Sequence, residues 1–185
     1  MEKCVLIGGF GGQGILFMGK IIAQAAMLSG REVTWFPSYG AEIRCGTANC
    51  TVIVSDESIG SPVVGRADVI IVFNEASLIK YSTRIAEGGL ILYDSSLMRT
   101  GAVDADDQRD MRGIDASAQA MAMGSARAAN MVMLGAAAAL TDIIDERFLL
   151  DAIEENISGL QRRDVAVNKK AFIKGFALYE NSQGI

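Results

Sequence analysis

The feature that most constrains the fold is a glycine-rich turn placed between an apolar run and a helical pattern. Residues 4–8 are apolar and end in glycine, which is typical of a buried parallel strand. Residues 15–28 have helical spacing. Between them, G-x-G-x-x-G is matched at Gly9, Gly11 and Gly14. In this strand–turn–helix context, backbone N–H groups at the helix start attract anions.

This turn is the first candidate binding site, and its residues are Gly9, Gly11, Gly12, Gln13 and Gly14. The alternative explanation has equal weight: the glycines allow a tight turn and close packing of helix on strand. A dinucleotide site also needs a carboxylate at the end of the second strand. Glu32 stands at the start of that strand instead, so NAD binding is disfavoured.

Strand and helix patterns alternate along the rest of the chain. We predict an α/β fold over residues 1–185: a single Rossmann-like domain, a mainly parallel sheet with helices on both faces, and a helical C-terminal region. Pro37 is expected to end the second strand, and the acidic residues 100–112 are expected to be irregular and exposed. Expected strands cover 32–36, 49–55, 68–73 and 89–93, and expected helices cover 15–28, 75–86, 116–140 with a break near 124–125, 146–156 and 165–179.

Composition excludes several functions. The net charge is −5 and no Lys/Arg cluster occurs, so nucleic-acid binding is not expected. Apolar runs are shorter than the roughly 20 residues of a membrane span, and the N-terminus has no leader pattern, so the chain is expected to be cytoplasmic. Histidine is absent, which excludes histidine-based catalytic triads and histidine metal ligands from this chain.

A second polar cluster follows the second strand, at the carboxyl edge of the predicted sheet. It offers Ser38, Tyr39, Glu42 and Arg44, and Arg44 is suited to hold a phosphate or carboxylate. Open α/β sheets bind ligands at this edge. Residue types alone favour the plainer interpretation, in which Glu42 and Arg44 pair on an exposed loop.

Together the two segments resemble the gamma subunit of 2-oxoacid:ferredoxin oxidoreductases. The resemblance continues through 68–74, 89–94, 130–135 and 168–175, and Cys45 departs from it where the family usually has glycine. The matching residues of the two segments are Gly9, Gly11 to Ile15, Val33, Thr34, Pro37 to Gly40, Glu42, Arg44 and Gly46.

The resemblance implies a non-autonomous subunit of a larger enzyme. Such enzymes oxidatively decarboxylate a 2-oxoacid, form an acyl-coenzyme A and reduce ferredoxin. Thiamine diphosphate, Mg and iron–sulfur clusters are implied to sit in alpha and beta partner subunits, with a ferredoxin-like delta subunit as a further partner. No cofactor or catalytic residue is assigned to this chain alone, and coenzyme A is the co-substrate of the complex.

The residues agree with that division of labour. The chain has no Gly-Asp-Gly thiamine signature and no C-x-x-C cluster motif, and Cys45 and Cys50 are best explained as small buried residues. We take 2-oxoglutarate as the best guess among 2-oxoglutarate, pyruvate, branched-chain and aryl 2-oxoacids. Two other functions stay open: a stand-alone nucleotide- or anion-binding module without catalysis, and an independent reductase.

Overall fold

A computed structural model of the chain describes residues 1–38, 48–99, 109–157 and 162–180. A six-stranded sheet forms its centre. In chain order the elements are β1 (Glu2–Gly9), α1 (Ile15–Leu28), β2 (Glu32–Ser38), β3 (Ala48–Ser55), β4 (Ala67–Val72), α2 (Glu75–Tyr81), η1 (Ser82–Arg84), β5 (Ile85–Asp94), η2 (Ser95–Leu97), β6 (Asp110–Ile114), α3 (Ala116–Ala122), η3 (Ala126–Ala128), α4 (Ala129–Leu140), α5 (Glu146–Ile157) and α6 (Arg162–Tyr179), where η denotes a 3₁₀ turn.

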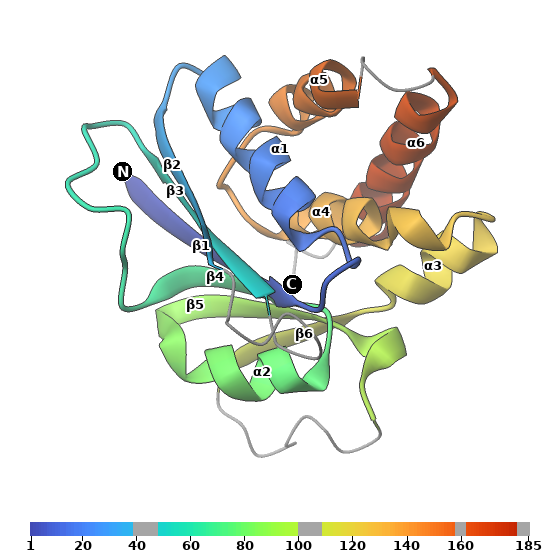
Figure 1. Cartoon of the computed structure of the whole chain (residues 1–185), viewed down its shortest axis with the longest axis horizontal. Coiled ribbons are helices and arrows are strands. Elements are labelled where there is room, and N and C mark those ends of the chain that lie inside the picture. The colour runs from blue at the N-terminus through green and yellow to red at the C-terminus, as the bar shows by residue number, and fades with distance from the viewer. Residues whose placement is uncertain (39–47, 100–108, 158–161, 181–185) are drawn as a thin grey trace.

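The strands lie in the order β2-β3-β1-β4-β5-β6 (Figure 1). β1 pairs in parallel with β4, β4 with β5, and β5 with β6. β3 runs antiparallel to both of its neighbours, β1 and β2, so β2 points in the same direction as β1. The mainly parallel α/β architecture predicted from the strand–helix alternation is confirmed, with β3 as the reversed strand.

Two apolar layers cover the sheet, because successive strand residues point to opposite faces. Val5 and Ile7 of β1 pack into the larger layer with α1 and α3 to α6. Cys4 and Leu6 of the same strand pack into the smaller layer with Leu78 of α2. Figure 1 shows α2 alone on its side of the sheet, opposite α1. Helices therefore lie on both faces, as predicted.

Three local predictions need correction. Pro37 lies within β2 and does not end it, because β2 is an edge strand and an edge tolerates a residue without an N–H. The segment predicted to be irregular contains β6 at residues 110–114, the opposite edge strand. The helix expected over 75–86 ends at Tyr81, and β5 begins at Ile85, four residues before its predicted start.

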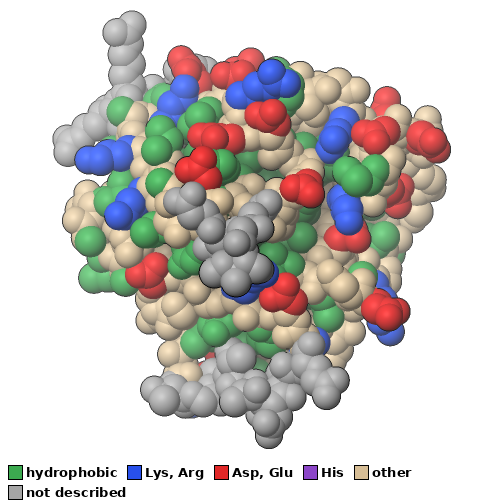
Figure 2. Space-filling model, turned by 180° about the vertical axis from the view of Figure 1, so that it is seen from behind, with side chains coloured by type: hydrophobic (Ala, Val, Ile, Leu, Met, Phe, Trp, Pro, Cys, Tyr) green, Lys and Arg blue, Asp and Glu red, His purple; other side chains and the backbone are tan. Residues whose placement is uncertain are grey.

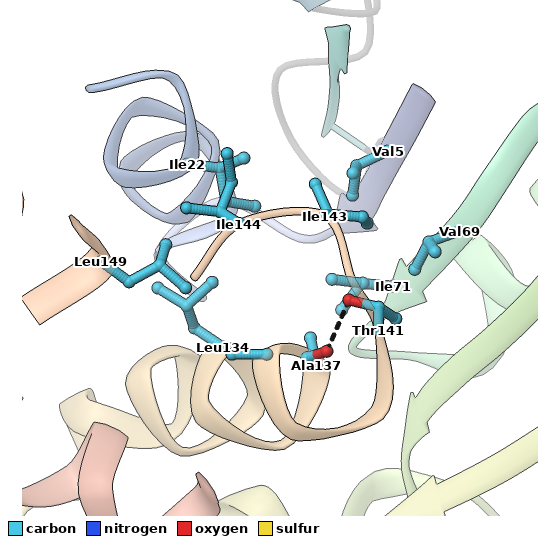
Figure 3. A pocket seen from close by; sticks show the side chains of 11 residues that line it. Val5, Ile22, Val69, Ile71, Leu134, Ala137, Thr141, Ile143, Ile144 and Leu149 are labelled. Carbon is cyan, nitrogen blue, oxygen red and sulfur yellow. Dashed lines mark hydrogen bonds between the residues drawn. The ribbon is translucent and has the colours of Figure 1, made fainter. Parts of the chain in front are cut away.

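A narrow apolar cavity lies between the sheet, α1 and α4 (Figure 3). Its one polar side chain, Thr141, donates a hydrogen bond to the Ala137 carbonyl oxygen at 2.7 Å, so the cavity walls offer a ligand little to bind. We read the cavity as a packing defect. Its lining residues are Val5, Ile22, Val69, Ile71, Leu134, Ala137, Ala138, Thr141, Ile143, Ile144 and Leu149.

The surface is mixed in charge. Figure 2 shows Lys and Arg side chains interspersed with Asp and Glu over the face seen from behind. Ion pairs on the surface include Lys3–Asp68 and Arg112–Asp110. Within the described residues, no helix has the length and low charge needed to cross a membrane.

Candidate functional site

The glycine turn joins β1 to α1, as predicted. Gly12 and Gly14 adopt the left-handed conformation, with φ of 92° and 74°. Gly14 is the N-cap of α1 and supplies no side-chain cap, and the first turn of α1 has no acidic residue. Within the described part of the chain, no hydrogen bond uses the backbone N–H groups of Gly11, Gly12 or Gly14. The turn therefore presents unpaired donors at the positive end of a helix.

The glycines of the turn differ in what they contact inside the protein. A Cβ on Gly9 would lie 2.8 Å from Gln13 Oε1, and one on Gly14 would lie 2.3 Å from Asn130 Nδ2. Internal packing therefore accounts for both residues. A Cβ on Gly11 would meet no atom within 4 Å, and the Gly11 φ lies outside the left-handed range. Nothing inside the described protein requires glycine at position 11, and this position leaves room for a molecule to approach the backbone.

Asn130, near the start of α4, completes the inner wall of the turn. Its side chain is 4% exposed, and Nδ2 donates to the Gly14 carbonyl oxygen at 3.2 Å. Its Oδ1 is buried without a hydrogen-bond partner in the described structure. The sequence analysis did not predict Asn130 as a site residue, because 116 positions separate it from Gly14. The signal that could have found it is its place at the start of residues 130–135, one of the segments that carry the resemblance.

Gln13 stays a predicted cofactor-binding residue, and in the structure its side chain bonds to other parts of the protein. Its amide bonds to the Phe10 N–H, to the Phe73 carbonyl oxygen and to Asn74. Asn74 is also the N-cap of α2. These contacts anchor the turn to the end of β4.

The second predicted cluster is described only at its ends. Ser38 closes β2 and pairs with Asn49, which in turn pairs with Gly8 of β1. The cluster was expected to follow a strand adjacent to β1, but β3 lies between them, so Ser38 and Gly8 are two strand spacings apart, about 10 Å. Both still lie at the carboxyl edge of their strands. The other predicted members, Tyr39, Glu42 and Arg44, lie outside the described residues.

The two described cysteines are not reactive thiols. Cys4 and Cys50 are buried, and burial raises the pKa of each to about 12. Both are therefore protonated near neutral pH, which suits small apolar packing residues. For Cys50 the predicted role is confirmed, and Cys45 lies outside the described residues.

Asp94 is a buried carboxylate that the sequence analysis placed only at a strand end. It is 0% exposed and lies at the carboxyl end of β5. Its oxygens accept hydrogen bonds from the Ser96 N–H at 3.1 Å and from the N–H and hydroxyl of Ser117. These bonds join the end of β5 to the start of α3, so Asp94 holds the sheet edge to the helix.

The other hollows lie away from the turn. Two of about 320 Å³ and 370 Å³ meet at Glu87 to Gly89, at the amino end of β5, so they lie at the sheet edge opposite the turn. Both hollows mix acidic and basic side chains. Among the residues that the structure describes, no group of three His, Cys, Asp or Glu side chains is arranged to hold a metal ion.

Sequence comparisons match this chain to one family over nearly its whole length. The family model described as pyruvate ferredoxin/flavodoxin oxidoreductase matches residues 4–178. Ketoisovalerate oxidoreductase subunit VorA of Methanothermobacter thermautotrophicus is 43% identical over 162 residues, covering 87% of this chain and 33% of that protein. 2-Oxoglutarate synthase subunit KorC of Methanocaldococcus jannaschii is 33% identical over 178 residues, covering 95% of this chain and 93% of that protein.

Solved structures share the fold. The gamma subunit of a keto/oxoacid ferredoxin oxidoreductase from Geobacter sulfurreducens superposes with a TM-score of 0.80 at 30% identity, covering 95% of this chain and 96% of that one. A 2-oxoglutarate:ferredoxin oxidoreductase from Magnetococcus marinus, with 2-oxoglutarate, coenzyme A and succinyl-CoA bound, gives 0.81 at 30% identity, covering 97% of this chain and 31% of that one. The chain thus spans about a third of some relatives and nearly all of others.

Proposed function

This chain belongs to the pyruvate ferredoxin/flavodoxin oxidoreductase family, and from that membership we propose that it acts as the gamma subunit of a complex that converts a 2-oxoacid and coenzyme A to acyl-coenzyme A with ferredoxin as electron acceptor. The observation that carries this proposal is the end-to-end correspondence with a solved gamma subunit, 95% of this chain against 96% of that one. Alpha and beta subunits, and a ferredoxin-like delta subunit, are the proposed partners.

Thiamine diphosphate, Mg and iron–sulfur clusters are proposed to belong to the partner subunits, where thiamine diphosphate supplies the decarboxylation chemistry. The cytoplasmic location expected from the sequence and the single-domain boundary at residues 1–185 stay predictions.

We propose coenzyme A as the ligand of the glycine turn. The turn offers unpaired N–H donors from Gly11, Gly12 and Gly14, which suit phosphate oxygens at a helix start. We propose that the chain binds and orients coenzyme A here, with Ser38, Tyr39, Glu42 and Arg44 forming the rest of the edge.

The identity of the 2-oxoacid also belongs to the proposal. The sequence analysis favoured 2-oxoglutarate, and relatives named for that substrate are 33% identical or less. A relative named for ketoisovalerate is 43% identical, which makes a branched-chain 2-oxoacid the first substrate to test. 2-Oxoglutarate and a branched-chain 2-oxoacid should be assayed together with pyruvate and aryl pyruvates as one panel of substrates.

The first prediction is that the purified chain alone turns over no 2-oxoacid, and that the complex purified with its partner subunits does. The physical reason is that the proposed thiamine diphosphate and clusters belong to those partners. The measurement is reduction of a viologen dye with coenzyme A and each 2-oxoacid of the panel. Turnover by the lone chain, or a complex inactive with every 2-oxoacid, would overturn the subunit proposal; coenzyme A binding by a chain that recruits no partners would favour a stand-alone module.

The second prediction concerns Gly11→Ala in the assembled complex. Open space surrounds the new Cβ, so the melting temperature should change little, whereas the methyl group should block the approach of coenzyme A to the backbone. Loss of one charge-assisted hydrogen bond predicts an increase of about 10-fold in the KM for coenzyme A.

The matched control for Gly11→Ala is Gly60→Ala, whose Cβ also meets open space, on a loop outside the turn. This control should leave both the stability and the KM for coenzyme A unchanged. If Gly11→Ala behaves in the same way as Gly60→Ala, coenzyme A does not approach the turn.

A further inference from the structure

A hydrogen-bond chain runs from the glycine turn to the helix on the opposite face of the sheet. Gln13 Oε1 accepts from the Phe10 N–H at 2.6 Å and from Asn74 Nδ2 at 3.1 Å, and Gln13 Nε2 donates to the Phe73 carbonyl oxygen at 3.2 Å. Asn74 Oδ1 accepts from the Ser77 N–H at 2.8 Å. One glutamine and one asparagine thereby join α1, β4 and α2.

The backbone partners fix the orientation of both side-chain amides. The Phe10 N–H can only donate and the Phe73 carbonyl can only accept, so Gln13 has one arrangement that satisfies both. The Ser77 N–H likewise turns Asn74 Oδ1 toward α2, which leaves Asn74 Nδ2 for Gln13. Each amide therefore holds the other in a single orientation, which is the condition for a rigid link.

The absence of a side chain at Gly9 leaves space for the Gln13 side chain and its hydrogen bonds. A Cβ at this position would approach Gln13 Oε1 to 2.8 Å, so a larger residue would push the Gln13 side chain out of its bonds. The Phe73 N–H also donates to the Gly8 carbonyl oxygen at 3.0 Å, which ties the end of β4 to β1 beside the turn. The turn is thus held by contacts within the protein, while the N–H groups of Gly11, Gly12 and Gly14 have no partner in the described structure.

We propose that Gln13 and Asn74 are positioning residues, which preorganise the glycine turn for its ligand without contacting it. This inference rests on the proposed binding of coenzyme A at the turn. Gln13 pairs the Phe10 N–H and ties the turn to Phe73, while the N–H groups of Gly11, Gly12 and Gly14 have no partner in the described structure. A preorganised set of donors binds more tightly because the ligand does not have to order it.

The test uses Gln13→Met and Asn74→Ser in the assembled complex. Methionine has a similar length without the amide, and serine retains the N-cap of α2 without reaching Gln13. Each variant should raise the KM for coenzyme A by about 5- to 20-fold, while kcat at saturating coenzyme A and the KM for the 2-oxoacid stay within twofold. A purely structural defect would instead lower kcat by reducing the fraction of active complex.

The double variant should be no worse than the stronger single one, because both substitutions break the same link. Gln24→Met is the matched control: Gln24 lies on α1, the helix that follows the turn, and donates to Glu155 Oε2 at 2.9 Å, away from the turn. It should leave the KM for coenzyme A unchanged.

Amide hydrogen exchange of the full chain separates this inference from the proposed function. Gln13→Met should speed exchange of the Phe10 amide, whose hydrogen bond it removes.

If Gly11→Ala raises the KM for coenzyme A but Gln13→Met and Asn74→Ser do not, the positioning role is overturned and the proposed coenzyme A site stands. If all three leave the KM unchanged while Phe10 exchange is faster, coenzyme A binding at the turn is itself overturned, and the positioning role falls with it. Should Gln13→Met fail to fold, Asn74→Ser decides alone.

Discussion

Alanine at Gly135 or Gly175 is expected to lower the melting temperature by about 10 °C or more, or to prevent folding. The two glycines lie where α4 and α6 cross. A Cβ on Gly135 would lie 2.0 Å from the Phe172 carbonyl oxygen, and a Cβ on Gly175 would lie 1.9 Å from the Val132 carbonyl oxygen. Both obstacles are helix backbone, so no side chain can rotate away and the helices must separate. We expect a loss of about 3–5 kcal/mol in the free energy of unfolding.

The predicted loss of stability is opposite in sign to the usual effect of replacing glycine by alanine in a helix. Glycine to alanine inside a helix ordinarily stabilises it by about 0.5–1 kcal/mol, because alanine loses less backbone entropy. The close helix crossing reverses that sign at both positions. Thermal and urea denaturation of the full chain measure it, with Gly60→Ala as the control that should lie within about 0.5 kcal/mol of the parent. Unchanged stability of the Gly135 variant would mean that α4 and α6 do not cross this closely.

The sequence predicts the order of elements well because the periodicities are strong. Helix α1 has its predicted bounds at Ile15 and Leu28, and the break in the alanine-rich region falls near Gly124, as expected. The short strand β6 was missed because Asp110 to Ile114 has none of the β-branched richness of the central strands. β6 is a strand because it pairs with β5, and the residue pattern of a short segment does not reveal a pairing with a distant strand.

The position and direction of β3 in the sheet also could not be predicted from the sequence. Residues 49–55 were predicted as a strand, but the direction of this strand depends on its antiparallel pairing with β2 and on its insertion beside β1. Local pattern does not distinguish an inserted antiparallel strand from another parallel one. The consequence for the site is that Ser38 lies two strands from Gly8 and not beside it.

The sequence predicted the glycines of the candidate site, but it did not predict the asparagine side chains that contact the turn. The turn between residues 9 and 14 has a local signature, whereas Asn74 and Asn130 come from other elements, far along the chain. A single asparagine carries no signature of its partners, so only the fold brings these side chains to the turn. The same holds for Asp94 and Ser117 at the neighbouring strand end.

Gly14→Ala is expected to combine a stability loss of about 2–5 kcal/mol with loss of coenzyme A binding by the assembled complex. Two physical effects add at this position. A φ of 74° costs an L-residue about 1–2 kcal/mol. The new Cβ would also lie 2.3 Å from Asn130 Nδ2, so Asn130 must move, and its buried side-chain amide loses its hydrogen bond to the Gly14 carbonyl oxygen, at about 1–3 kcal/mol.

Two further variants separate these effects. Gly12→Ala has a φ of 92° in the same turn but open space around its Cβ, so it should show the conformational cost alone. In a Gly14→Ala/Asn130→Ala double variant the clash disappears, so the stability loss should be smaller than the sum of the two single losses. The measurements are melting temperature for the full chain and the KM for coenzyme A for the complex. If the Gly14 and Gly12 variants lose equal stability and the losses in the double variant are simply additive, Asn130 does not support the turn.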